Sequence, residues 1–294
     1  MLRRALLQNL AALSSLKAAA STPKTPTQTI QLAAEPIEIH DVQGTPTESA
    51  FLVFHKSTNS WQIHRTNPDS IIPLPAGQYT TLGLTPTGLY VRARRSTGQP
   101  VNSILRITPG AAPEFIGHLP LSAAYEPVFF HRTQVLQSDP YSLHVSGLSP
   151  AGIGRARDYT ANIPHCSYDI LPTQALFTAF DGSSLTTFDL DTRTVSTAPI
   201  ALPGPKPEPS TSSYVMSVVV PATGTDAEGN LYAIVLPSPR AAVRCVKIAP
   251  DGAASLWATL EVPPSAKGFK KLLFQNGNSF AVVFANGSIA SYDL

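Results

Sequence analysis

The sequence predicts an all-β chain, a six-bladed β-propeller whose last blade is completed by an N-terminal strand. Three observations support this prediction. Short apolar strands recur at a nearly regular spacing, four of them fill each repeat, and one strand near the start of the chain has no neighbours of its own. The 28 prolines and 18 glycines agree with it, because both residue types favour turns over long helices.

The spacing is measured from the strand that opens the second hairpin of each repeat. Its matching residues are Trp61, Ile104, Leu143, Leu185, Val243 and Ile289, so successive repeats lie 43, 39, 42, 58 and 46 residues apart. The longest step contains the Pro-rich residues 204–213, which we expect to be a loop insertion. A period of about 40 to 50 residues with several short strands is typical of radial or linear β repetition.

Three repeats carry a similar turn between their first and second strands. The clearest copy is DAEGNLY at 226–232, and TPTGLY (85–90) and NGNSF (276–280) occupy the same place. Gly supplies the positive φ that such turns often need. Because blades pack face to face, we expect the aromatic residue at the head of the second strand to fill the wedge between neighbouring blades.

The last repeat is incomplete. It stops at Leu294 after its third strand, whereas TIQLAA at 29–34 precedes the first complete set of strands. Pairing these segments would give the sixth blade its outer strand and remove an open sheet edge. Ile30 and Leu32 alternate with polar neighbours, so we expect a half-buried edge strand. A β-sandwich or two smaller domains would explain single strands, but not the period or the extra strand.

The first residues have the three parts of a bacterial export signal. Arg3 and Arg4 precede a modest apolar run at 5–16, and small residues, Ala18-Ala19-Ala20, follow it. The paired arginines resemble the twin-arginine type, and the run is too short and too polar to span a bilayer. We therefore expect an export signal at 1–20, a spacer at 21–27, a single propeller domain at 28–294, and a periplasmic or secreted protein.

The pattern resembles the NHL-like and gluconolactonase-like six-bladed propellers. The resemblance covers residues 28–294 in period, and in wording only DAEGNLY and, more loosely, APDG at 249–252. Gluconolactonase-type members are metal-dependent hydrolases whose site uses a Glu, two Asn and an Asp in the central channel. The segment that would carry the Asp reads YVMSVVVPATG at 214–224, without a carboxylate. We therefore assign no catalytic residue, no metal ligand and no cofactor.

Polar residues on the first strand of each blade are the candidates for a site in the channel, because these strands run along the central axis. As speculative ligand-binding residues we select His40, Asp41, Glu126, His131, His165, Tyr168, Asp169 and Lys270. For each of these residues there is an alternative interpretation: the side chain faces water in the channel or forms a hydrogen bond between blades.

The basic residues are unevenly distributed. No lysine lies between Lys56 and Lys206, but nine arginines do. Arg92, Arg94 and Arg95 are candidates to face an anion, since the guanidinium fork suits carboxylates. The alternative is ion pairing between blades, and the sequence leaves both open. Seven arginines (92, 94, 95, 106, 132, 155 and 157) share one segment with four acids, Glu114, Glu126, Asp139 and Asp158.

These features favour an exported, non-catalytic module that binds a small ligand or an envelope protein, and we expect a monomer. The alternative functions are a channel-site hydrolase or lactonase with an altered site, and a scaffold subunit. The net charge of +2 argues against a nucleic-acid partner. Cys166 and Cys245 lie on strands of different blades, so we expect two free thiols.

The export signal leads to a first testable prediction. We expect cleavage after Ala20, because small residues at positions 18 and 20 form the small-x-small site of a signal peptidase. N-terminal sequencing of the protein from its native host checks this. A cytosolic chain that still begins at Met1 would contradict the prediction.

Overall fold

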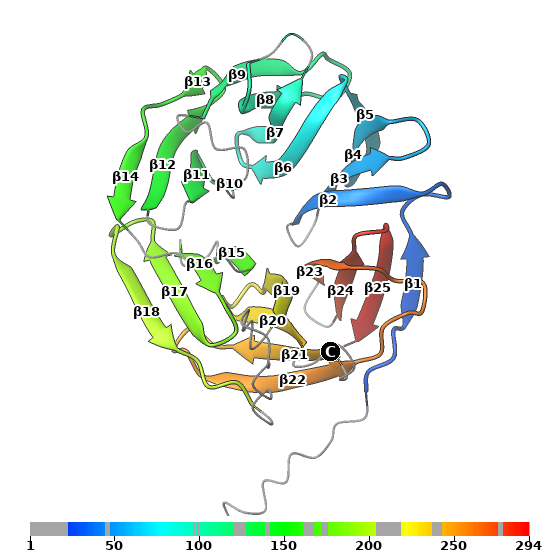
Figure 1. The fold of residues 1–294 in the computed structure, drawn as a ribbon, viewed down its shortest axis with the longest axis vertical. Coiled ribbons are helices and arrows are strands. Elements are labelled where there is room, and N and C mark those ends of the chain that lie inside the picture. Colours follow the sequence, from blue (N-terminus) through cyan, green and yellow to red (C-terminus); the bar gives the residue numbers. More distant parts are fainter. Residues whose placement is uncertain are drawn as a thin grey trace, which may run out of the picture.

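The computed structural model describes residues 23–44, 48–96, 98, 100–119, 128–138, 142–160, 167–171, 176–203, 219–236, 243–275 and 279–293. These residues form six small antiparallel sheets around a central axis (Figure 1). The predicted all-β fold with six blades is therefore confirmed. Within the described part of the chain, no helix is long and apolar enough to cross a lipid bilayer.

The first half of the chain supplies blades 1 to 3. Blade 1 comprises β2 to β5, blade 2 comprises β6 to β9, and blade 3 comprises β10 to β14. Their bounds are β2 (Ile37–Gly44), β3 (Ser49–His55), β4 (Ser60–Thr66), β5 (Asp69–Leu74), β6 (Gly77–Thr85), β7 (Gly88–Ser96), β8 (Ser103–Ile107), β9 (Glu114–His118), β10 (Val128–His131), β11 (Gln134–Ser138), β12 (Ser142–Ser149), β13 (Gly152–Ile153) and β14 (Arg157–Thr160).

The second half supplies blades 4 to 6. Blade 4 comprises β15 to β18, blade 5 comprises β19 to β22, and blade 6 joins β23 to β25 with β1 from the start of the chain. Their bounds are β15 (Ser167–Leu171), β16 (Leu176–Phe180), β17 (Ser184–Asp189), β18 (Val195–Pro199), β19 (Val219–Thr225), β20 (Leu231–Leu236), β21 (Val243–Ile248), β22 (Ala254–Leu260), β23 (Phe269–Gln275), β24 (Ser279–Phe284), β25 (Ser288–Asp293) and β1 (Gln28–Gln31).

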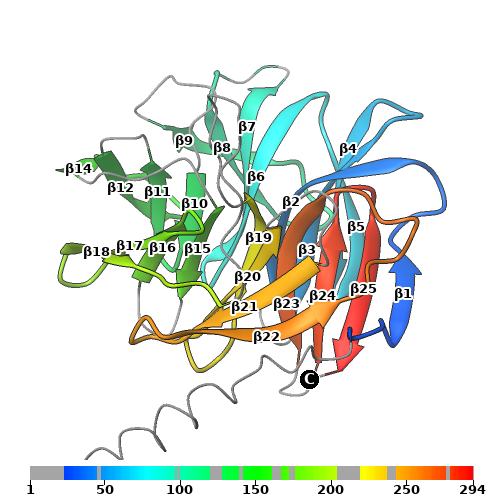
Figure 2. The same ribbon diagram turned by 60° about the horizontal axis from the view of Figure 1, so that its bottom comes forward.

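The predicted ring closure is confirmed. β1 pairs antiparallel with β25, in a register that sets Gln28 opposite Ser291 and Gln31 opposite Ser288, and the two strands lie side by side in Figure 2. The expected half-buried pattern is wrong, because all four residues of β1 are exposed and Ile30 is 46% exposed. Closure at this strand therefore relies on backbone hydrogen bonds, while the apolar contact comes from Leu32 and Ala33 just beyond it.

The chain ahead of β1 is also held. The Lys24 backbone N–H donates to the Thr259 carbonyl at 2.7 Å, and the Glu261 N–H donates to the Lys24 carbonyl at 3.0 Å. The Lys24 ammonium donates to the Asp293 carbonyl at 2.7 Å. The end of the predicted spacer therefore fastens blade 5 to blade 6. The predicted export signal lies outside the described residues.

The core is divided among the blade interfaces. Six buried apolar clusters each join two neighbouring blades, one cluster at each of the six interfaces of the ring. The predicted role of the aromatic residues holds at Tyr90 and Tyr232. The Tyr90 ring stacks on Phe130 of blade 3 at 6.0 Å, and the Tyr232 ring lies 4.4 Å from Phe274 of blade 6.

Near the axis the inner strands approach too closely for side chains at two positions. A Cβ at Gly224 on β19 would lie 2.3 Å from the Leu272 carbonyl oxygen of β23, and one at Gly83 would lie 2.3 Å from the Phe130 ring. Interiors packed at this density do not absorb an added methyl without a backbone shift. These two glycines therefore allow the inner strands to meet.

A shared irregularity sets where inner-strand side chains point. The first strands of blades 1, 2, 5 and 6 each shift register against the second strand, at His40, Tyr79 to Thr81, Val219 to Ala222, and Lys270. A bulge adds one residue to one strand and redirects the side chains beside it. The simple alternation of inner and outer faces therefore fails at these places.

Ring closure gives a stability prediction. A chain that begins at residue 36 should unfold at a temperature about 10 °C below that of a chain that begins at residue 23. It loses the β1–β25 ladder and the Leu32 contact, worth about 3 kcal/mol together. The hydrogen bonds of Lys24 and Glu35 are lost with them. Thermal unfolding followed by circular dichroism measures the difference. The full mature chain is the control and should match the chain from residue 23, whereas equal melting temperatures for all three would show that β1 does not hold the ring.

Candidate functional site

The described channel candidates lie on the first strands of their blades, as the sequence predicts. His40 and Asp41 are on β2, His131 is on β10, Asp169 is on β15 and Lys270 is on β23. For Tyr168 only the backbone position on β15 is described. Glu126 and His165, and also Cys166, lie outside the described residues. The structure therefore tests the arrangement of five of the eight candidates.

Asp41 connects two blades. One carboxylate oxygen accepts the Val42 backbone N–H at 2.8 Å, and the other accepts the Leu82 N–H of β6, in blade 2, at 2.7 Å. Burial raises the pKa of Asp41, while these backbone hydrogen bonds and the nearby Lys271 ammonium oppose the rise. Both carboxylate oxygens are thus occupied by the backbone, one within blade 1 and one from blade 2.

Asp169 forms an ion pair with Lys271, a residue that the sequence analysis did not select. The Lys271 ammonium lies 2.8 Å from the Asp169 carboxylate, and the two side chains are only 20% and 10% exposed. β15 belongs to blade 4 and β23 to blade 6, so the pair reaches past blade 5. The expected residue, Lys270, stands at the bulge of β23, and the pattern Phe-Lys-Lys-Leu does not reveal that bulge.

His40 is not part of this charged group. Its ring lies 4.5 Å from the Trp61 ring and 6.3 Å from the Phe54 ring, both in blade 1. Burial lowers the pKa of His40, Lys270 and Lys56 lower it further, and Glu38 opposes them. The imidazole is therefore neutral at neutral pH and packs as an aromatic side chain.

His131 lies apart from the other candidates. It is buried, its pKa is lowered mainly by that burial, and its Nε2 has no hydrogen-bond partner among the described residues. The nearest charges are Arg132, which lowers the pKa further, and Asp191, which raises it. The structure therefore brings together Asp41, Asp169 and Lys271, but not the two histidines.

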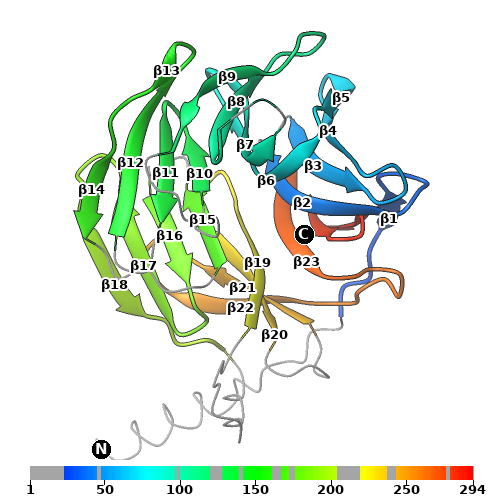
Figure 3. The same ribbon diagram turned by 45° about the horizontal axis from the view of Figure 1, so that its top comes forward.

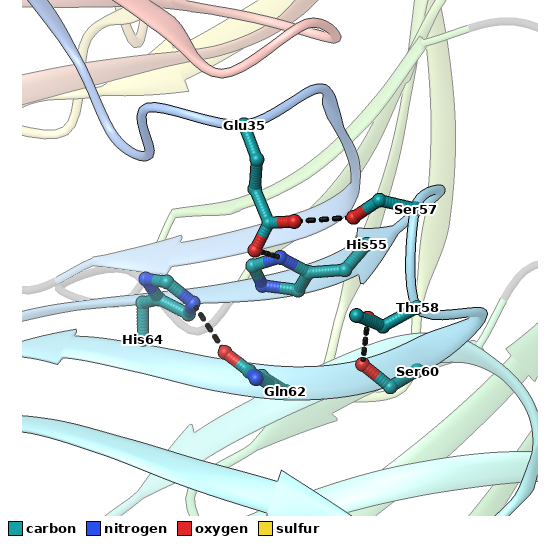
Figure 4. A network of polar contacts seen from close by, with 7 residues as sticks. All are labelled: Glu35, His55, Ser57, Thr58, Ser60, Gln62 and His64. Atoms are coloured by element: carbon teal, nitrogen blue, oxygen red, sulfur yellow. Dashed lines mark hydrogen bonds and ion pairs between the residues drawn. The ribbon is translucent and has the colours of Figure 1, made fainter.

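Blade 1 holds a second polar network, shown in Figure 4, with residues of the kind found in hydrolytic sites. Glu35 accepts a hydrogen bond from Ser57 and is bonded to His55 Nδ1 at 2.7 Å. These two bonds, that of Ser57 first, lower the pKa of Glu35. A Ser-His-acid triad needs the serine on the other imidazole nitrogen, but here both groups bind the carboxylate. The network instead fastens the connection between β1 and β2 to blade 1.

The three arginines proposed to face an anion are placed differently from one another. Arg92 is buried, and its Nη2 donates to the Asn102 side-chain oxygen at 3.0 Å within blade 2. Arg94 is half-buried and Arg95 is exposed. Two arginines farther along the chain form ion pairs, Arg106 with Glu114 at 3.8 Å and Arg132 with Asp191 at 4.0 Å.

Among the described residues, no group of three or more His, Cys, Asp or Glu side chains is arranged to hold a metal ion.

Comparison with known proteins supports the fold only. No family model and no curated protein sequence matches the chain. Among solved structures, luciferin-regenerating enzyme is similar with a TM-score of 0.57 and 13% identity, over 91% of this chain and 95% of that one. U3-55K has a TM-score of 0.55 and 11% identity, over 92% and 100%. The WD40 β-propeller domain of Doa1 has a TM-score of 0.52 and 10% identity, over 92% and 97%.

The ion pair in the channel gives a second stability prediction. Lys271→Met should lower the free energy of unfolding by about 3 kcal/mol, because it leaves the buried Asp169 carboxylate without its countercharge. Adding Asp169→Asn should recover at least half of the loss, since the uncompensated charge is then removed as well. Urea unfolding of the two single variants and the double variant measures the coupling. A Lys271→Met chain as stable as the parent would show that the pair contributes nothing.

Proposed function

We propose that the chain is an exported, non-catalytic β-propeller that binds a small ligand or a partner protein through one face of its ring. The observation that carries the proposal is the state of the channel charges. Asp41 is hydrogen-bonded by two backbone N–H groups, and Asp169 is paired with Lys271. Each of these carboxylates is thus held in a contact that joins two blades, which gives it a structural role in the ring.

The rest of the molecule supports the same proposal. The ring is closed by β1, each interface between blades contains an apolar cluster, and the inner strands meet closely, so the propeller offers a rigid support for a binding surface. Solved structures with this architecture include a WD40 domain and U3-55K, and the likeness to them extends to the fold alone. Export rests on the pattern of residues 1–20.

The alternative is a lactonase or related hydrolase that acts in the channel. It is supported by the presence of a carboxylate and an ammonium group from the inner strands of blades 4 and 6, and by the fold that the chain shares with luciferin-regenerating enzyme. In this alternative the Asp169–Lys271 pair would have to open when substrate binds, because each of the two groups is the other's partner.

A paired assay separates the two functions. The mature chain, beginning at residue 21, is tested for hydrolysis of a panel of lactones with Ca²⁺, Mn²⁺ or Zn²⁺ added, beside the Asp169→Asn variant. We expect no saturable hydrolysis that depends on Asp169. Metal-dependent turnover that falls at least about a hundredfold in Asp169→Asn, at a temperature where circular dichroism shows the variant folded, would show that the chain is a hydrolase and not a non-catalytic binding module. In parallel, thermal shift with small acids, sugars and peptides should find a ligand that stabilises the chain with a saturable dose response.

A further inference from the structure

Blade 3 departs from the regular four-stranded pattern. Its outer strand is broken into β13, which pairs with β12 at Leu148 and Ser149, and β14, which pairs with β12 from Ser142 to Val145. Residues 154–156 leave the ladder between these two pieces, and the Gly154 N–H donates to the Gly147 carbonyl at 2.8 Å. Figure 3 shows the two pieces along the outside of β12.

The break leaves a pocket between blades 3 and 4. Its volume is about 270 Å³, and Gly147 lies in its wall with nothing within 4 Å of the position where a Cβ would stand. The pocket opens on the face of the ring that carries the β10–β11 and β17–β18 hairpins, because its lining includes the start of β11 and the turn after β17. The lining residues are Gln134, Val145, Gly147, Arg155, Arg157, Tyr159, Phe188, Leu190 and Arg193.

Three arginines from two blades converge on this pocket. Arg155 and Arg157 come from blade 3, and Arg193 comes from the turn between β17 and β18 of blade 4. All three are exposed, and none has an ion-pair partner among the residues that the structure describes. Arg106 and Arg132, from the same arginine-rich segment, do have acidic partners. The pocket therefore gathers three arginines that form no ion pair within the described part of the chain.

The described acids near the pocket are already bonded to other groups. Asp158 follows Arg157 in the chain, but strand alternation turns it to the other face of β14, where it pairs with His144 Nδ1 at 2.6 Å. Asp189 accepts the backbone N–H groups of Asp191 and Thr192, each at 2.8 Å. Asp191 lies 4.0 Å from Arg132. None of these three carboxylates therefore forms an ion pair with a pocket arginine.

The turn that presents Arg193 has an unusual conformation. Arg193 has a φ of 64°, in the left-handed region that favours Gly or Asn, and its N–H donates to the Asp189 carbonyl at 2.8 Å. A long charged side chain at such a position costs free energy, and positions of this kind are concentrated at binding sites.

The apolar part of the pocket is formed by Tyr159 and Phe188, whose rings lie 5.2 Å apart.

We infer that this pocket binds a small organic anion, a carboxylate carried on an apolar or aromatic body. Guanidinium groups bind carboxylates through paired hydrogen bonds, and the two rings and Leu190 offer an apolar surface to the rest of the ligand. The volume is slightly below the roughly 300–1,000 Å³ of typical ligand pockets, which limits the ligand to about the size of one ring with its substituents. The inference deepens the proposed binding function and rests on it.

Isothermal titration of the mature chain with phthalate and benzoate tests the inference, at 150 mM NaCl to screen non-specific attraction between charges. Benzamide, which lacks the charge, and inorganic phosphate, which lacks the apolar body, are the ligand controls. We expect saturable binding of phthalate, weaker binding of benzoate, and no binding of benzamide or phosphate. Binding of phosphate as tightly as phthalate would overturn the inference, because the apolar surface would then play no part.

Two variants locate the site. Arg157→Gln should weaken phthalate at least about tenfold by removing charge-assisted hydrogen bonds. Gly147→Leu should abolish binding by filling the pocket, with the melting temperature kept because the side chain enters open space. Arg106→Gln, the same change of charge outside the pocket, is the matched control and should bind as the parent does. Equal affinity in the parent and Arg157→Gln would overturn the inference even if Gly147→Leu did not fold.

The two proposals fail in different ways. If neither phthalate nor benzoate binds the parent chain, the anion site is wrong, whereas a binding function at another surface still stands. If the chain hydrolyses a lactone and Asp169→Asn abolishes the activity, the proposal of a non-catalytic binding module is wrong. Phthalate binding that is unchanged in Asp169→Asn and lost in Gly147→Leu would support the pocket and separate it from the channel.

Discussion

The antiparallel ladder between β1 and β25 is the interaction on which the rest of the ring depends. Every blade buries apolar residues against two neighbours, so an open blade 6 would expose an edge of its own sheet and loosen the wedges on both sides. The ladder is formed by the backbone of exposed residues. Closure therefore depends mainly on the presence of a strand at that place, with one side-chain hydrogen bond added by Gln31, whose Nε2 donates to the Asn286 carbonyl at 2.7 Å.

Two further sets of contacts hold the ring where the ladder does not reach. Ahead of β1, Lys24 joins β22 to the last residues of β25. After it, Glu35 binds His55 and Ser57 at the start of blade 1. At the axis, the Asp41–Leu82 hydrogen bond joins blades 1 and 2, and the Asp169–Lys271 pair joins blades 4 and 6. Buried charged groups of this kind are tolerated because each has its partner.

The packing between blades explains why the proposed binding site lies away from the axis. Where the repeat is regular, side chains of adjacent blades fill the wedge between them and leave little space for a ligand. Blade 3 is irregular at residues 154–156, and the space beside Gly147 stays open there. In a repeat protein, one irregular repeat can form a binding surface while the other repeats keep their packing. The three arginines at this irregularity form no ion pair among the described residues, whereas Asp169 and Lys271 in the channel are paired with each other.

The sequence alone determined the architecture. Four apolar strands per period, Gly-containing turns such as DAEGNLY and one unpaired strand at 29–34 were sufficient, because strand alternation and turn chemistry are local properties. It also predicted the strand on which each described channel candidate lies. Only the tertiary structure decided which side chains meet. The bulge at Lys270 made Lys271 the partner of Asp169, Arg92 turned out to be buried against Asn102, and Arg193 from blade 4 joined Arg155 and Arg157. The Asp169–Lys271 pair joins residues 102 positions apart, and the three pocket arginines come from two blades, so their geometry depends on bulges and strand breaks that no local pattern encodes.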